Sequence, residues 1–159
     1  MTGKMWKALA LAAFVTSLPA AAQGNGNLST KVEVEKTTTG QDGQPGGKTY
    51  VTPDVVVPGD RVRISLAFTN NGAEPASGVV ISNPIPLALL FDGTDDPAGF
   101  AVSIDGGKQF SPLSDLTVPV GGAAPRAATA ADVTHVRWNW TDAIGPGQTR
   151  TVAFFGRVR

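Results

Sequence analysis

The sequence predicts an all-β protein, a Greek-key β-sandwich of seven to eight strands. Beyond residue 22 the chain is rich in Gly, Pro, Thr and Val, several segments alternate apolar with polar residues, and turn signals recur about every ten residues. The connections are too short for crossover helices, so an antiparallel sandwich is favoured over a parallel sheet. A closed barrel is the structural alternative.

The first 22 residues are typical of a cleavable signal peptide. Lys4 and Lys7 form a short basic start, and residues 8–18 are an uncharged apolar run that is too short to span a bilayer. Pro19 and three alanines follow, so we expect cleavage between Ala22 and Gln23 and export to the periplasm or the medium. An uncleaved N-terminal anchor is the alternative.

The remainder is predicted to contain a flexible spacer over residues 23–30 and a single domain over residues 31–159. Cysteine is absent, so disulfides and thiolate metal sites are excluded and stability depends on packing and strand pairing. Removal of Lys4 and Lys7 leaves a net charge of −2 with both signs interspersed. Such a charge pattern favours binding to neither nucleic acid nor anionic lipid. We expect no membrane-spanning segment after residue 22.

The first strands follow from alternation and turn chemistry. Residues 28–38 alternate and predict a half-exposed strand, and the Gly-rich residues 40–47 predict a loop. Residues 49–57 are expected to be extended at a sheet edge, because Pro53 lacks a backbone donor. Residues 61–69 have the clearest alternation and predict a central strand.

A turn at residues 70–72 (NNG) predicts that the chain returns as a strand over residues 78–82. Residues 87–91 are a short apolar stretch expected to close one end of the core. Residues 92–99 are expected to form an acidic surface loop.

The strongest hairpin signal is Asp105-Gly106-Gly107, which lies between residues 100–104 and residues 109–110. Residues 119–132 are rich in Ala, Gly and Pro and are expected to cross the surface with one helical turn. The last two predicted strands are residues 134–140 and 149–159.

Four segments together resemble a known bacterial family. They are residues 57–60 (VPGD) before the central strand, residues 69–72 (TNNG), residues 76–86 (ASGVVISNPIP), and Pro146-Gly147 before the last strand. From about residue 51 onward the chain resembles the domain of unknown function 11 (conserved repeat) family of immunoglobulin-like modules in secreted and surface proteins. The resemblance implies an immunoglobulin-like sandwich. This chain has Asn83 where the family usually has Asp, and one module where the family commonly has tandem repeats.

No set of residues predicts catalysis. His135 is the single histidine, and its place in the alternation predicts a surface position opposite Val136. No Gly-x-Ser-x-Gly motif presents a nucleophilic serine, so we expect a protein that is not an enzyme and has no cofactor. Asp92, Asp95 and Asp96 are a weak calcium candidate, and an ordinary solvated loop is favoured.

Three aromatic residues are candidates for contact with a partner. Trp138 and Trp140 share a strand face with Val136, so core packing is favoured over a stacking platform for sugar. Trp140 becomes a contact candidate if it lies at the rim. Phe155 falls on the opposite side from the apolar residues of the last strand, and we expect it to be exposed and available to a partner.

These observations predict an exported, non-enzymatic structural or interaction module of the bacterial cell envelope that binds a protein partner. The first alternative is a module that binds carbohydrate or a small ligand through Trp138, Trp140 or residues 119–132. The second is a pilin-like subunit that assembles by strand donation from its N-terminal strand.

Overall fold

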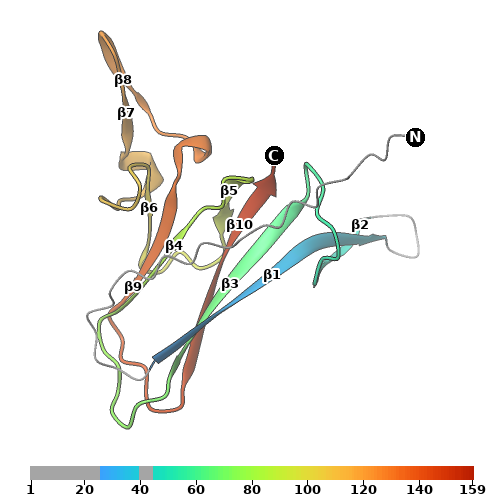
Figure 1. Ribbon diagram of the computed structural model, residues 1–159, viewed down its shortest axis with the longest axis vertical. Helices are drawn as coiled ribbons and strands as arrows, with labels where there is room; N and C mark the ends of the chain where they lie inside the picture. Colours follow the sequence, from blue (N-terminus) through green and yellow to red (C-terminus); the bar gives the residue numbers. More distant parts are fainter. Residues whose placement is uncertain (1–25, 40–44) are drawn as a thin grey trace, which may run out of the picture.

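The computed structural model describes residues 26–39 and 45–159, and in them β-strands are the main secondary structure and helix is almost absent (Figure 1). The all-β prediction is confirmed. Helix is limited to two short 3₁₀ turns, Leu113–Asp115 and Ala130–Asp132, and no helix of the described residues is long and apolar enough to cross a membrane. The predicted signal peptide and its cleavage site at Ala22 and Gln23 lie outside the described residues.

The larger sheet contains five strands, and every neighbouring pair is antiparallel. Its spatial order is β2-β1-β3-β10-β5, so the first and last long strands both flank β3. The strands are β1 (Gly26–Thr39), β2 (Pro45–Val51), β3 (Arg61–Asn70), β5 (Leu89–Thr94) and β10 (Thr149–Val158).

A second sheet contains three antiparallel strands in the order β4-β9-β6, and a third is a two-stranded hairpin of β7 and β8. The hairpin projects beyond the end of both larger sheets (Figure 1). The strands are β4 (Val79–Pro84), β6 (Phe100–Ser103), β7 (Thr117–Val120), β8 (Ala123–Ala127) and β9 (His135–Trp140).

One hydrophobic core lies between the five-stranded and three-stranded sheets. Trp138 of β9 is 6.4 Å from Phe154 of β10 between ring centroids, and Phe100 of β6 lies 5.0 Å from Trp138 and 5.9 Å from Phe91 of β5. The indole nitrogen of Trp138 donates a 2.8 Å hydrogen bond to the carbonyl of Asp96, so this polar group is satisfied within the core. These aromatic contacts connect the two sheets.

The alternation in β3 places its residues as the sequence predicted. Val62, Ile64 and Leu66 are buried in the core, while Arg61 and Arg63 point to the opposite face of the sheet. Antiparallel partners lie on the same face, so this alternation also fixes which residues of β1 and β10 face the core.

Several strand boundaries differ from the prediction. β1 begins at Gly26, so residues 26–30 belong to a strand instead of a spacer. β2 begins at Pro45, within the expected loop, because residues 45–51 pair with the end of β1; the hydroxyl of Thr38 also donates a 2.8 Å hydrogen bond to the carbonyl of Gly47. The strand predicted at residues 49–57 is therefore wrong in extent. Only its first three residues belong to β2, and the chain is irregular from residue 52 to residue 60.

The described residues contain ten strands, not seven or eight. Two of them, β7 and β8, occupy half of the segment that was expected to cross the surface with a helical turn. Gly122 has φ of +73° at the hairpin turn, a conformation that glycine adopts without steric cost. The expected helical turn is a short 3₁₀ turn at Ala130–Asp132.

The predicted turn at residues 105–107 forms, but the hairpin around it is minimal. Only one bridge, between Val102 and Ser111, connects the two sides. The carboxylate of Asp105 accepts hydrogen bonds from the backbone N–H groups of Lys108 and Gln109, at 3.1 and 3.0 Å. The side chain thus satisfies donors that a longer strand pair would have satisfied.

Candidate functional site

The outer face of the five-stranded sheet, opposite the core, carries a group of charged and aromatic side chains that we call the outer cluster. Its members come from β1, β2, β3, β5 and β10 and lie side by side because the strand pairing aligns them. They are Glu33, Glu35, Lys48, Tyr50, Arg61, Arg63, Asp92, Phe155 and Arg157.

Two arginines cover two aromatic rings in the outer cluster. The guanidinium carbon of Arg61 lies 3.8 Å from the ring centroid of Phe155, and that of Arg63 lies 3.7 Å from the centroid of Tyr50. The two rings are 6.3 Å apart. Such stacking is favourable because the positive charge meets the negative face of the ring.

Phe155 is therefore 1% exposed, and the prediction that it is an exposed contact residue is wrong. The alternation correctly placed Phe155 on the face away from the core. It could not show that Arg61 and Tyr50, distant in sequence, would cover that face.

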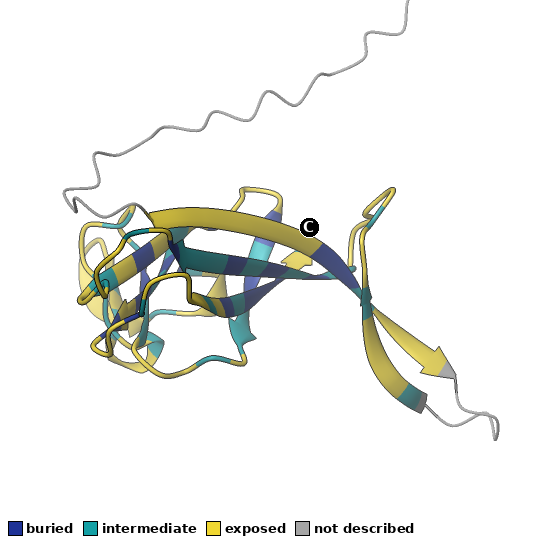
Figure 2. Ribbon diagram, turned by 90° about the horizontal axis from the view of Figure 1, so that it is seen from below, coloured by how far each residue is buried: buried dark blue, intermediate teal, exposed yellow. Residues whose placement is uncertain are grey.

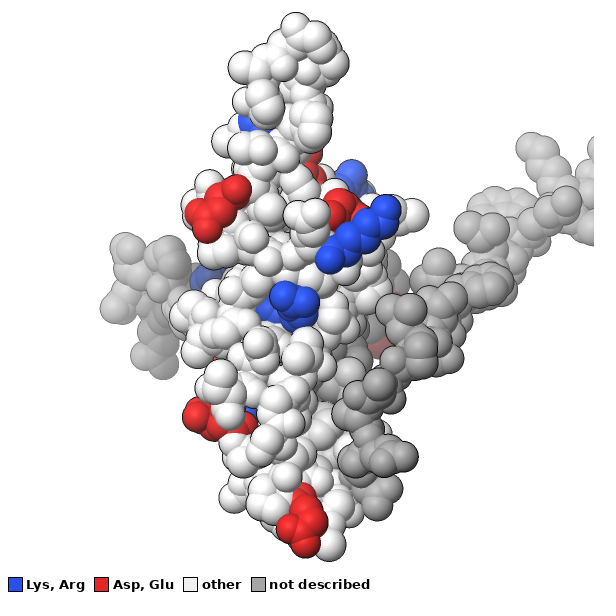
Figure 3. Space-filling view, turned by 90° about the vertical axis from the view of Figure 1, so that its left-hand side faces the viewer, with Lys and Arg blue, Asp and Glu red and all other residues white. Residues whose placement is uncertain are grey.

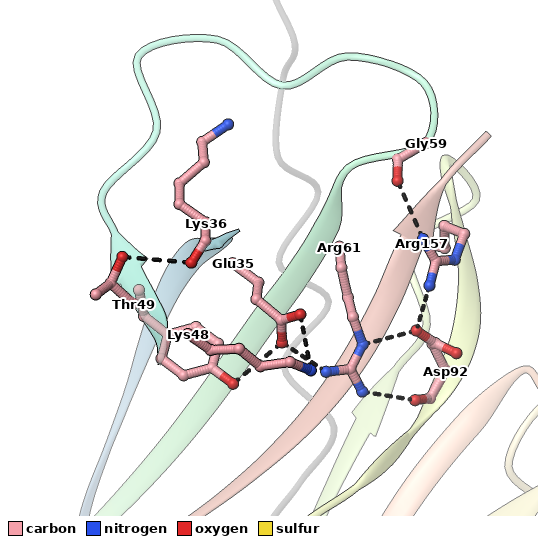
Figure 4. Close-up of polar contacts among 9 residues, drawn as sticks. Glu35, Lys36, Lys48, Thr49, Gly59, Arg61, Asp92 and Arg157 are labelled. Atoms are coloured by element: carbon pink, nitrogen blue, oxygen red, sulfur yellow. Dashed lines mark hydrogen bonds and ion pairs between the residues drawn. The ribbon is translucent and has the colours of Figure 1, made fainter. Parts of the chain in front are cut away.

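A chain of ion pairs crosses the outer cluster, as Figure 4 shows. Glu35 accepts from Lys48 at 3.0 Å and from Arg61 at 2.7 Å. Arg61 continues to Asp92 at 2.7 Å, and Arg157 donates to the same carboxylate at 3.2 Å. This series of ion pairs connects β2 to β5 across the whole width of the sheet.

The two glutamates of β1 are nearly enclosed within this cluster. Hydrogen bonds from Lys31 at 2.8 Å and Arg63 at 2.6 Å lower the pKa of Glu33. Burial raises the pKa of Glu35, but hydrogen bonds from Lys48 and Arg61 outweigh it, so the net pKa is also lowered. Both carboxylates are thus held ionised by partners within the chain, and the outer cluster connects strands to one another.

The first half of β1 has the opposite character. Residues 26–32 are all exposed, and this part of the strand is yellow along its length in Figure 2. Pairing with β3 covers residues 26–34, whereas β2 pairs with β1 only from Val34 onward. Residues 26–33 therefore have one edge that no other described strand pairs with, and we call this segment the free edge of β1.

Apolar side chains accompany the free edge. Leu28 and Val32 lie on the core-facing side of β1, since their partners are Phe68 and Ile64, yet they are 47% and 44% exposed. Val51 of β2 is on the same side, opposite Val34, and is 44% exposed. A strip of apolar surface therefore borders an unpaired strand edge.

The β7–β8 hairpin is a second exposed feature. Residues 117–125 carry no charge, and the projecting end of the molecule is almost free of charged side chains in Figure 3. At its base Arg126 forms a two-pronged ion pair with Asp132, at 2.6 and 2.8 Å. Arg126, together with hydrogen bonds from Thr129, lowers the pKa of Asp132.

Both tryptophans on β9 are buried. Trp138 is 0% exposed and Trp140 is 2% exposed, so the favoured prediction of core packing is confirmed. Trp140 does not lie at the rim, and its candidacy as a contact residue is wrong. Arg150 lies over its ring at 4.7 Å and Val79 pairs with it, which explains the burial.

The aspartates at residues 92–96 point in different directions. Asp92 belongs to the outer cluster, whereas the carboxylate of Asp96 accepts the backbone N–H of Ala153 at 2.8 Å and Asp95 is exposed. Among the described residues, no three acidic or histidine side chains come together as a possible metal site. His135 is half-buried, with its Nδ1 3.2 Å from the hydroxyl of Thr134.

Two shallow depressions lie elsewhere on the surface. One, of about 300 Å³, is bordered by Asp105 and Asp132, whose carboxylates already accept hydrogen bonds within the chain. The other, of about 410 Å³, is an open hollow beside Gln148 and Arg150. Neither presents a converging set of polar groups for a ligand.

The outer cluster was not predicted as a site, and the strand that carries the free edge was predicted as a site only in the pilin-like alternative. The available signal for the cluster was the regular placement of Arg61 and Arg63 on one side of β3 and Glu33 and Glu35 on one side of β1. Pairing the two strands would have brought the opposite charges together.

No protein-family model matches the chain, and no curated protein or solved structure is similar to it. The function of the chain is therefore inferred from its own residues and their arrangement.

Proposed function

We propose that this protein is an exported, non-enzymatic interaction module of the bacterial cell envelope, an immunoglobulin-like Greek-key sandwich that binds a protein partner along the free edge of β1. The observation that supports this function is the exposure of a seven-residue strand segment, residues 26–32, on both of its faces.

An unpaired strand edge is a binding surface because its outward backbone N–H and C=O groups can pair with another strand. Natural proteins often protect such edges with charges, prolines or bulges. Residues 26–32 contain one charge, Lys31, and no proline, and they pair with β3 without a register shift. The segment therefore lacks most of these protections.

The apolar strip adds specificity to such an interaction. Leu28, Val32 and Val51 would lose exposed area if a partner strand carried apolar side chains on the same face. Backbone pairing supplies affinity, and the alternate side chains select the partner.

Location in the envelope is supported by the signal-like residues 1–22 and by the resemblance to immunoglobulin-like modules of secreted proteins. Carbohydrate binding through tryptophan has lost its supporting feature, because Trp138 and Trp140 are buried. Assembly by strand pairing retains its support, since it uses the same free edge.

The test is affinity capture of the full chain with a C-terminal tag, expressed with its N-terminal segment so that export proceeds, from crosslinked envelope fractions. Val32→Lys places a charge on the apolar side of the free edge, and Val120→Lys is the matched control on the projecting hairpin, since both valines are more than 40% exposed. We expect a specific envelope protein, or a ladder of the chain itself, with the unmodified chain and with Val120→Lys, and its loss with Val32→Lys. Equal capture with both variants would contradict the proposed function.

A further inference from the structure

We infer that the partner strand is the free edge of a second copy of this chain, paired antiparallel about a two-fold axis at Thr30. This inference rests on the proposed function and names the partner of the same surface. Pairing would extend the five-stranded sheets of two copies into one continuous sheet.

The length of the free edge determines the register. On the side away from β3, no described strand pairs with β1 up to Glu33, and β2 occupies that side from Val34 onward. Antiparallel pairing about Thr30 uses residues 27–33 of both copies and stops one residue before β2.

The same register matches side chains by type. It places Leu28 of each copy opposite Val32 of the other, on the core-facing side, so the two exposed apolar residues cover one another. Thr30 pairs with Thr30 on that side, a favourable cross-strand combination. A two-fold axis requires such self-complementarity, because each residue must suit its partner in both copies.

Charges are also compatible on the outer side. Lys31 would lie opposite Ser29, and Glu33 would lie opposite Asn27, so no like charges face each other directly. Each Lys31 already pairs with Glu33 of its own chain at 2.8 Å. A partner with a different sequence would have to reproduce this neutrality, whereas a second copy supplies it automatically.

The contact is one strand pair wide and belongs to the small class of interfaces, so we expect a weak, reversible dimer. A thiol at the axis can trap it. The chain has no cysteine, so Thr30→Cys introduces a single thiol per copy. Directly opposite residues of antiparallel strands have Cα atoms about 4.5–5.5 Å apart, within the range that a disulfide spans.

The experiment compares disulfide formation by Thr30→Cys under mild oxidation with that of Ala123→Cys, which places an exposed thiol on β8. We expect covalent dimer from Thr30→Cys to form at least tenfold faster. A mixture of Leu28→Cys and Val32→Cys should give mainly the mixed disulfide. In this register Leu28 of one copy lies directly opposite Val32 of the other, whereas the two Leu28 residues are four positions apart along the strands, as are the two Val32 residues. Rates equal to Ala123→Cys would overturn the inference.

Failure of the second-copy inference can be distinguished from failure of the proposed function. If Thr30→Cys stays monomeric while Val32→Lys still abolishes capture of an envelope protein, the free edge binds a different protein and only the second-copy inference is wrong. If neither substitution has an effect, both proposals are wrong.

Discussion

The two halves of β1 place neighbouring residues in opposite environments. Val34, in the second half, is 1% exposed, while Val32, on the same face of the first half, is 44% exposed. The second half of the strand pairs with β2, and Val34 at its start pairs with both β2 and β3; Val34 lies in the core and Glu35 in the outer cluster. The first half is paired with β3 alone among the described strands. Whether a residue of β1 is buried therefore depends more on which elements lie beside it than on its polarity.

The extent of the smaller sheet explains this difference. Its core-facing residues, such as Ile81 and Trp138, pack in one cluster with residues of β3, β5 and β10 and with Val34. Leu28 and Val32 are absent from that cluster, although they point to the same side. The sheet of five strands is wider than the sheet of three strands that covers it.

The largest expected effect tests the outer cluster. Phe155→Ala removes a ring enclosed by Arg61 and Tyr50 and should lower the free energy of unfolding by about 3–5 kcal/mol. Val32→Ala, in the exposed half, should cost about 1 kcal/mol or less, because the lost methyl groups are already half in water. Urea denaturation measures both, and equal losses would show that the outer cluster is packed no better than the free edge.

A second test concerns Asn70, the residue paired with Gly26 at the start of the free edge. Its buried side chain donates 2.8 Å hydrogen bonds to the carbonyls of Glu74 and Ile144. Asn70→Ala leaves these carbonyls without that donor and should cost about 1–3 kcal/mol. The exposed Asn71→Ala is the control and should change stability by less than about 0.5 kcal/mol. Similar melting temperatures for the two variants would contradict this role.

The strands of the core could be predicted from the sequence, because their alternation is local. Val62, Ile64 and Leu66, and the pair Trp138 and Trp140, were placed in the core correctly. The burial of Phe155 could not be predicted, since it depends on Tyr50, whose extended segment was expected at a sheet edge but without its pairing to β1. The exposure of Leu28 could not be predicted either, because apolar alternation does not reveal whether a second sheet extends far enough to cover it.

Acid should weaken the outer cluster selectively. The pKa values of Glu33 and Glu35 are lowered in the folded chain, so the unfolded chain binds more protons as pH falls below the usual glutamate pKa of about 4.3. Their contribution is present above that pH and is lost as pH falls through the folded pKa values. We expect Glu33→Gln/Glu35→Gln to be less stable at pH 7 and to show a flatter loss of stability between pH 5 and pH 3.

The control for this experiment is Glu74→Gln, which alters an exposed residue outside the cluster. Its free energy of unfolding, measured by chemical denaturation at each pH, should fall between pH 5 and pH 3 as steeply as that of the unmodified chain. An unchanged slope in the double variant would mean that other carboxylates cause the acid sensitivity.

The smallest expected effect is in hydrogen exchange and leaves the global stability unchanged. Alternate backbone amides of residues 27–33 face away from β3 and should exchange rapidly in dilute protein, whereas amides of residues 34–37, between β2 and β3 or bonded to β2, should be protected. Raising the protein concentration should slow exchange in residues 27–33 alone. Exchange that does not depend on concentration would argue against pairing of the free edge with itself.

The projecting hairpin of β7 and β8 affects how much the sequence of this protein can change during evolution. Its base is closed by a 2.9 Å hydrogen bond from the backbone N–H of Ala128 to the carbonyl of Leu116, and no residue of β7 or β8 is buried. Selection for folding therefore places few constraints on the residues beyond that bond. Over evolutionary time this hairpin can lengthen, shorten or change sequence faster than the rest of the molecule, and a foreign peptide could replace it without disturbing the sheets.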